Sequence, residues 1–324
     1  MPHVVCLRPL HPDAMERLRA EPGLQVTMLT EVNAETLREP MKTADAIIVR
    51  ATKIDRAFLD NAPMLRICAR HGVGYDAVDV KALTERGIPL TVTPDANALS
   101  VAEHAMMLML TTARRTLDYD RNTKALDWGP KPSLKTWDLA GRTVLVVGFG
   151  RIGGRVARLC AAFGMEVLVH DPYIPQNTIK GAGFRPVKVL HEGLAEADVV
   201  TTHCPSNEET RGMVNGAFLA AMKPGATYIN TARGTLVDEA ALTAALKSGH
   251  LGSVGLDVFW EEPVTTKLPF LDFPNVVVSP HSAAATEQST RRMGLSCAES
   301  IFSLFRGDLD PDVVINKEVL RGNA

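Results

Sequence analysis

Short apolar runs alternate with amphipathic segments along almost the whole chain of 324 residues. Most of the runs are rich in β-branched residues and continuously apolar, which is typical of strands buried on both faces of a parallel sheet. The strands predicted in this way cover residues 4–8, 46–50, 65–70, 90–92, 143–148, 166–171, 199–204, 227–232, 253–258 and 275–279. Segments between them, such as residues 80–87 and 239–249, have helical periodicity. This alternation predicts an α/β fold of doubly wound parallel sheets.

Two long helical patterns interrupt the alternation. Residues 97–126 predict one long helix, starting at a capping box of Ser100 and Glu103 and bridging two α/β units. Residues 287–307 predict a second helix, which we expect to return the chain to the first unit. The first domain is then discontinuous, with residues 1–98 and 285–324 on either side of a second domain at 99–284. The irregular residues 127–142 fit an arm that reaches another subunit and a plain surface loop equally well.

Composition excludes several classes of function. A net charge of −2 provides no basic field, so we expect no nucleic-acid partner. The longest apolar run, residues 105–110, is too short to cross a bilayer, and the N-terminus lacks a signal pattern, so we expect no membrane partner. The five cysteines are scattered and form no metal-ligand spacing. This predicts no metal site and no disulfide framework, and it favours a cytoplasmic protein.

A glycine-rich turn follows the predicted strand at residues 143–148 and opens a helix. Gly148, Gly150 and Gly153 have the spacing G-x-G-x-x-G, which counts as evidence only in this strand-to-helix context. The first glycine allows the tight turn, the second lets a pyrophosphate approach, and the third lets helix and strand pack. Free N–H groups at the helix start, where Arg151 and Ile152 stand, would receive the phosphates.

An acidic residue ends the next predicted strand. Asp171 lies about 20 residues beyond the glycines, where a carboxylate is expected to meet the ribose hydroxyls of a dinucleotide. A carboxylate repels a 2′-phosphate, and no arginine or lysine follows directly, so the sequence favours NAD over NADP. The alternative for Asp171 alone is a solvated residue at a strand end, but the surrounding pattern makes that interpretation weaker.

Polar residues also follow three later strands. Arg233, Glu262 and His281 come after the runs at 227–232, 253–258 and 275–279. The carboxyl ends of parallel strands face a common crevice, so these side chains can converge. A histidine suits the proton transfer of carbonyl reduction, a carboxylate orients it, and a guanidinium grips a substrate carboxylate. We interpret His281 as the acid/base, Glu262 as its partner and Arg233 as the substrate anchor. The alternative is three unrelated loop residues, including an ordinary surface ion pair.

The stretches that carry these residues, VVGFGRIG, NTARGTLVDEAAL, GLDVFWEEP and SPHSAA, resemble signatures of the D-isomer-specific 2-hydroxyacid dehydrogenases. The resemblance implies a Rossmann NAD-binding domain inserted into a discontinuous, flavodoxin-like substrate domain, and a homodimer formed through the NAD domain. It also implies the Arg–Glu–His set at Arg233, Glu262 and His281. Further cofactor contacts are implied at Cys204, Thr231, Ala232, Asp257 and His281. Substrate contacts are implied in the loop of Arg70, His71, Gly72, Val73 and Gly74.

Within that family the chain is most similar in pattern to the D-3-phosphoglycerate dehydrogenases, in which arginines matching Arg50 and Arg70 help to hold the phosphate. Two departures weaken the likeness: the stretch DWGPKPSL lacks an arginine, and His71 stands where a small residue is common. The chain stops at Ala324, so we expect no serine feedback through a C-terminal regulatory domain. Phosphoglycerate and other small acids, such as glycerate, glyoxylate, hydroxypyruvate or lactate, remain equal alternatives.

Two rival functions share the expected fold. Formate dehydrogenases carry glutamine where Glu262 stands, which argues against them. An NAD(H)-sensing interaction protein of the corepressor type can retain the whole catalytic set, so the motifs do not exclude it. His104 and His203 lie near the expected crevice, and we interpret both either as residues that support the contact residues of the site or as structural.

Overall fold

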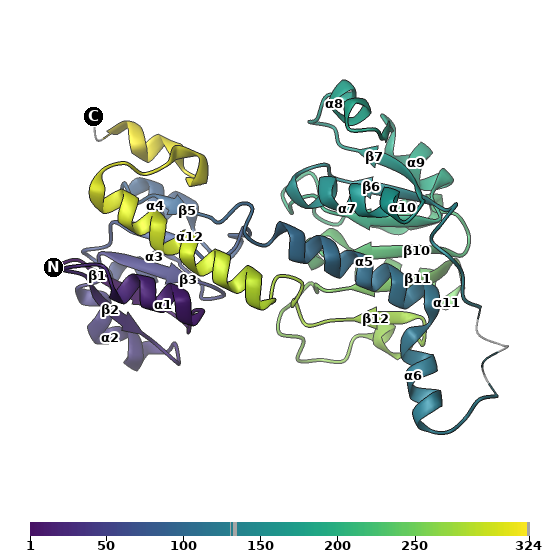
Figure 1. Ribbon diagram of the computed structural model, residues 1–324, viewed down its shortest axis with the longest axis horizontal. Coiled ribbons are helices and arrows are strands. Elements are labelled where there is room, and N and C mark those ends of the chain that lie inside the picture. Colours follow the sequence, from purple (N-terminus) through teal and green to yellow (C-terminus); the bar gives the residue numbers. More distant parts are fainter. Residues whose placement is uncertain (130, 132–134, 323–324) are drawn as a thin grey trace. The chain divides into compact units, whose positions relative to one another are not determined.

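The computed structural model describes residues 1–129, 131 and 135–322 (Figure 1). The chain forms two compact units, one made of Met1–Asn97 with Ala285–Ala324 and the other of Ala98–Ala284. Each unit contains one sheet whose described strand pairs are all parallel. The predicted fold class of two parallel-sheet α/β domains is therefore confirmed.

The first unit has a five-stranded sheet in the order β2-β1-β3-β4-β5, the order of flavodoxin-like folds. Its strands are β1 (His3–Cys6), β2 (Gln25–Met28), β3 (Ala46–Val49), β4 (Ile67–Arg70) and β5 (Leu90–Thr91). Its helices are α1 (Pro12–Arg19), α2 (Ala34–Lys42), α3 (Arg56–Asp60), α4 (Val80–Glu85) and α12 (Glu287–Arg306), with short 3-10 turns at Pro311–Val313 and Lys317–Gly322.

The second unit has a seven-stranded sheet in the order β12-β11-β10-β9-β6-β7-β8. Counted from β6, six of these strands follow the Rossmann order 3-2-1-4-5-6, and β12 extends the far edge. The strands are β6 (Thr143–Val147), β7 (Glu166–His170), β8 (Arg185–Pro186), β9 (Val199–Thr202), β10 (Ala226–Asn230), β11 (Leu251–Leu256) and β12 (Val276–Val278). The helices are α5 (Ala98–Arg114), α6 (Thr116–Lys124), α7 (Arg151–Ala162), α8 (Gln176–Gly181), α9 (Leu190–Glu196), α10 (Gly216–Ala221) and α11 (Glu239–Lys247), with 3-10 turns at Gly234–Leu236 and Pro269–Asp272.

Strand β6 shows why the strands of the second unit read as continuous apolar runs. Val144 and Val146 belong to the core shared with α5 and α7, whereas Leu145 and Val147 belong to the opposite core, shared with α9, α10 and α11. Successive residues therefore enter different cores, and both sets are buried. A polar residue at any of these positions would be buried without a partner, so the alternation of an exposed strand is absent here.

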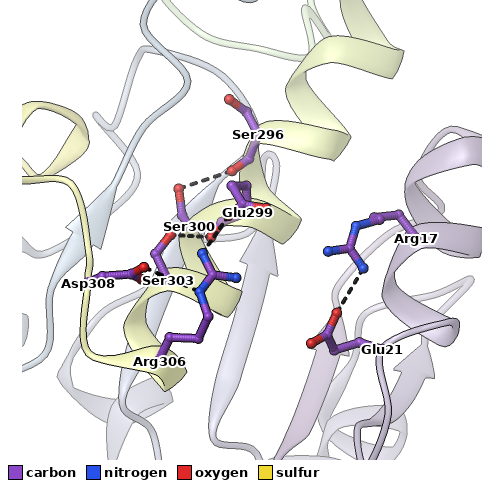
Figure 2. A network of polar contacts seen from close by, with 8 residues as sticks. All are labelled: Arg17, Glu21, Ser296, Glu299, Ser300, Ser303, Arg306 and Asp308. Atoms are coloured by element: carbon purple, nitrogen blue, oxygen red, sulfur yellow. Dashed lines mark hydrogen bonds and ion pairs between the residues drawn. The ribbon is translucent and has the colours of Figure 1, made fainter.

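Helix α12 packs against α1 in the first unit, and several polar residues of its C-terminal half bond one another within the helix (Figure 2). The hydroxyl of Ser300 donates to the carbonyl of Ser296 at 3.0 Å. At the C-terminal end, Arg306 bonds Glu299 at 2.7 Å, and left-handed Gly307 ends the helix at a φ of 82°. These local bonds leave the apolar side of α12 to pack on the sheet.

One predicted helix is wrong in detail. The segment predicted as a single helix at residues 97–126 is two helices, α5 and α6, because Arg115 adopts left-handed backbone at a φ of 50°. The Arg115 guanidinium bonds the nearly buried Asp118 at 2.5 Å, which holds the break. Helix α5 also begins at Ala98, so Ser100 lies within its first turn and is not the predicted cap.

Two edge strands, β2 and β8, were not predicted from the sequence. Part of the proposed arm, residues 130 and 132–134, lies outside the described residues. Across the described part of the chain, none of the helices is both long and apolar enough to cross a membrane.

Candidate active site

A glycine cradle joins β6 to α7 in the second unit. Gly148 has a φ of 95°, and a Cβ on it would lie 2.8 Å from the backbone nitrogen of Cys204. A Cβ on Gly153 would lie 1.9 Å from the carbonyl oxygen of Gly148, so only glycine allows this approach of helix to strand. A Cβ on Gly150 would meet nothing within 4 Å. The cradle is therefore tight on the protein side and open in front of Gly150, as a bound pyrophosphate requires.

Asp171 directly follows β7 and connects to the same cradle. Its carboxylate accepts the N–H of Phe149 at 2.7 Å and those of Tyr173 and Ile174 at 2.9 and 3.2 Å. The Tyr173 hydroxyl donates to Glu209, and this bond, with the charges of Glu209 and Asp171, raises the pKa of Tyr173. Two carboxylates thus lie near one another at this end of the crevice, which is unfavourable for a 2′-phosphate.

Three further residues implied for the cofactor lie just beyond β9 and β10: Cys204, Thr231 and Ala232. Burial, with the nearby charge of Asp171, raises the pKa of the Cys204 thiol to about 11, so this thiol is not a reactive nucleophile. The Thr231 hydroxyl oxygen is buried and finds no hydrogen-bond partner in the described part of the chain. An unsatisfied hydroxyl just beyond β10, at the same carboxyl-end edge of the sheet as the cradle, fits a dinucleotide that supplies the missing bond.

His281 and Glu262 form a hydrogen-bonded pair. The Nδ1 atom of His281 lies 2.5 Å from Oε2 of Glu262, and Oε1 of Glu262 accepts the N–H of Phe259 at 2.9 Å. Burial opposes the charge of Glu262, but the bonds from His281 and Phe259 and the charge of Arg233 together lower the pKa of its carboxyl. The carboxylate is therefore ionised at neutral pH and holds Nδ1 of the imidazole, which leaves Nε2 to face other groups.

Arg233 approaches this pair because Gly234 follows it. A Cβ on Gly234 would lie 1.9 Å from the carbonyl carbon of Phe259, so the backbones of the two loops are in direct contact. The contact brings Arg233 close enough for its charge to act on Glu262. The structure thus gathers Arg233, Glu262 and His281 beyond the carboxyl ends of the adjacent strands β10, β11 and β12.

Asp257 lies just after β11 and is completely buried. Its carboxylate accepts the hydroxyl of Ser279 at 2.6 Å and the amides of Ser282 and Ala283 at 2.8 and 2.9 Å. Its observed bonds therefore hold the loop that carries His281. A direct contact between Asp257 and the cofactor stays a prediction.

The loop after β4 in the first unit is organised by Arg70. Its guanidinium donates to the carbonyls of Gly74 at 2.6 Å and His71 at 2.5 Å, and Gly72 adopts a φ of 139°. Burial, with the charges of Arg50 and Arg70, lowers the pKa of His71 to about 4, so its ring is neutral. Arg50 is exposed at the end of β3. The substrate contacts predicted for this loop, including Val73, stay predictions.

Sequence reasoning did not identify Ser279 or the amide of Phe259 as parts of the site. Ser279 stands two residues before His281, but only the fold reveals its bonds to Asp257 and to His104 on α5. Within the described residues, no cluster of three or more histidine, cysteine, aspartate or glutamate side chains has the arrangement of a metal site.

Comparison with known proteins gives a consistent result. A model of the D-isomer specific 2-hydroxyacid dehydrogenase NAD-binding domain matches residues 106–283. A D-3-phosphoglycerate dehydrogenase of Methanocaldococcus jannaschii is 39% identical over 97% of this chain, but the chain spans only 59% of that protein. A glyoxylate reductase of Korarchaeum cryptofilum is 39% identical over 87% of this chain and 86% of its own length.

Solved structures agree with the sequence comparison. The structure of a D-lactate dehydrogenase from Aquifex aeolicus, complexed with NAD and lactic acid, matches with a TM-score of 0.82 and 30% identity. The match covers 99% of this chain and 98% of that one. The second unit is accordingly an NAD-binding domain, and the chain belongs to the D-isomer-specific 2-hydroxyacid dehydrogenase family.

Proposed function

We propose that the protein is an NAD-dependent oxidoreductase that interconverts a small D-2-hydroxy acid and its 2-oxo acid. The observation that carries the proposal is the pair of His281 and Glu262, 2.5 Å apart, with Arg233 beside it. This pair lies on the same sheet edge as the glycine cradle, where a nicotinamide ring would reach it.

The cofactor would be held by Gly148, Gly150, Arg151, Ile152, Gly153, Asp171, Cys204, Thr231, Ala232, Asp257 and His281. When bound, it supplies the hydride that reduces the 2-oxo carbon. The open space before Gly150 and the unsatisfied hydroxyl of Thr231 support this fit.

The chain's own residues would bind the substrate carboxylate and transfer the proton. Arg233 binds the substrate carboxylate and polarises the adjacent carbonyl. His281 donates its proton from Nε2 to the oxygen that becomes the hydroxyl, because Nδ1 is held by Glu262. Glu262 stabilises the protonated imidazole before transfer and fixes its orientation. In the reverse direction, the neutral imidazole accepts the same proton.

We propose a substrate-binding role in the first unit for the loop of Arg70, His71, Gly72, Val73 and Gly74. The exposed Arg50 supports a second anionic group, such as the phosphate of 3-phosphoglycerate. Because Arg70 already donates to loop carbonyls, an acid without a phosphate, such as glyoxylate, hydroxypyruvate or lactate, is equally well supported. The names of the relatives also include both kinds of substrate, since one is a D-3-phosphoglycerate dehydrogenase and another a glyoxylate reductase.

A homodimer formed through the second unit is part of the proposal. A groove between α5 and α7 is lined by Met106, Met107, Leu110, Leu159 and Phe163, among others. Met107 and Phe163 are 41% and 44% exposed, and a second copy would cover them. Light scattering after gel filtration tests this assembly.

All five cysteines are free, which suits the cytoplasmic location that we expect.

The decisive experiment is turnover. We would follow NADH oxidation with a panel of 2-oxo acids that includes 3-phosphohydroxypyruvate, glyoxylate, hydroxypyruvate and pyruvate. Loss of absorbance with at least one acid is expected, and the panel ranks the substrates. Tight NADH binding without turnover of any 2-oxo acid in the panel would refute the proposed enzymatic function and favour an NAD(H)-sensing protein.

A further inference from the structure

The loop that carries His281 has an unusual backbone and depends on one buried residue. His281 adopts a φ of 51°, a region that residues other than glycine occupy only with support from their surroundings. Its N–H donates to the carbonyl of Asp257 at 2.7 Å. The next two amides, of Ser282 and Ala283, donate to the carboxylate of the same aspartate. The placement of His281 therefore depends on Asp257 staying fixed.

A histidine on α5 completes the support of that carboxylate. Nε2 of His104 lies 2.7 Å from the hydroxyl oxygen of Ser279 and 3.4 Å from Oδ1 of Asp257. The Ser279 hydroxyl donates its only hydrogen to Asp257, at 2.6 Å, so its oxygen accepts from Nε2–H of His104. The bonds thus run in one direction, from His104 through Ser279 to Asp257, and link α5 to the His281 loop.

We propose that His104 is a positioning residue for His281. By donating to Ser279 it fixes the rotation of that hydroxyl. The Ser279 hydroxyl therefore keeps donating to Oδ1 of Asp257, which also accepts the amide of Ser282. The buried carboxylate then stays aligned with the loop amides, and His281 stays in its left-handed conformation. Without His104, Ser279 can rotate away and Asp257 loses a donor in a buried site. This inference rests on the proposed acid/base role of His281.

The first test uses hydrogen exchange, which needs no turnover. We would measure exchange of the Ser282 and Ala283 amides in wild type, His104→Ala and His104→Gln, where the glutamine amide can replace the Nε2–H donor. Loss of one donor should speed exchange at these amides about tenfold in His104→Ala. In His104→Gln the exchange rates should return toward those of wild type. The matched control is His250→Ala, since His250 bonds the carbonyl of Leu219 at 2.9 Å, away from the loop.

The second test is kinetic and uses the same variants. For His104→Ala we expect kcat to fall about tenfold or more while the Kd for NADH stays within about twofold. His281 is only one of many proposed cofactor contacts, so its displacement affects proton transfer far more than cofactor binding. His104→Gln should recover most of kcat. Equal loss in kcat and NADH affinity, or no recovery with glutamine, would contradict a positioning role.

A further variant guards against loss of folding. Ser279→Ala removes the middle of the chain of bonds, so the double variant with His104→Ala should be no worse than Ser279→Ala alone. Additive effects, or unchanged exchange at Ser282 and Ala283 in every variant, would overturn the proposal. If the wild type fails to turn over any 2-oxo acid, the proposed function fails, and the exchange data still decide whether His104 supports the loop.

Discussion

Replacement of Glu262 by glutamine tests the central pair most directly. The change keeps the size of the side chain and removes its charge. The amide oxygen can still accept the N–H of Phe259, and the amide nitrogen can donate to Nδ1 of the neutral imidazole, so the ring keeps its place. What changes is the stabilisation of protonated His281. Since reduction of the 2-oxo acid needs that proton, the basic limb of the pH–rate profile should move to lower pH.

The structure sets the size of this shift. The paired atoms are 2.5 Å apart, and the side chains of His281 and Glu262 are 47% and 33% exposed. Unit charges whose centres lie about 4 Å apart attract by about 1 kcal/mol in water and about 4 kcal/mol at the effective dielectric of a protein surface. Partial exposure favours the lower figure. Since about 1.4 kcal/mol corresponds to one pH unit, we expect a shift of about one unit.

The assay is the rate of NADH oxidation at saturating cofactor from pH 5 to 10, with the best acid from the panel. The matched control is Glu261→Gln, which removes the same charge from the adjacent exposed residue. Its profile should overlay that of wild type. A Glu262→Gln profile whose basic limb does not move, or moves to higher pH, would refute the assignment of Glu262 as the partner of His281.

Three further substitutions have defined outcomes. His281→Ala should lower kcat by a factor of about 10² to 10⁴ and leave NADH binding, followed by fluorescence titration, nearly unchanged; a parallel loss of both would contradict its acid/base role. Asp171→Ala should weaken NADH binding about tenfold and relax discrimination against NADPH, and an unchanged ratio of the two Kd values would remove its role at the ribose. Gly234→Ala should destabilise the fold by about 1–3 kcal/mol and lower activity with it, because the new Cβ meets the backbone of Phe259; a wild-type melting temperature would show that the loops can separate freely.

The pattern of apolar residues was sufficient to predict the central strands and the edge strands β5 and β12, but not the edge strands β2 and β8. Strands such as β6 are buried on both faces, so nearly every residue is apolar and the signal is strong. Strand β2 has no buried residue, and β8 has only two residues, one of them Pro186. At these two edges there is little selection for apolar side chains, so the sequence carries little strand signal.

The break between α5 and α6 shows a different limit. The residues around Arg115 have ordinary helical character, and the left-handed turn is held by ion pairs with Asp118. Such pairs are also common within helices, so the sequence does not distinguish a break from a continuous helix.

For the candidate site, the sequence identified the glycines, Asp171 and the three catalytic candidates, because each stands within a few residues after a strand. The bonds around Asp257 could not be predicted in this way. His104 and Ser279 are 175 positions apart in the chain, and only the packing of α5 brings them together. The buried His71 ring is a similar case, since nothing in RHGVGYD indicates that this histidine faces inward.

The first unit is assembled from both ends of the chain, and this has a consequence during synthesis. Cys297, Ile301 and Phe302 of α12 share a core with Val4 and Cys6 of β1. A ribosome must make the whole NAD-binding domain before α12 emerges. Until then, the face of the first sheet that α12 covers is only partly buried. The later domain can complete its core first. The nascent chain therefore depends on that exposed face being shielded, by a chaperone or by transient collapse, until translation is nearly finished.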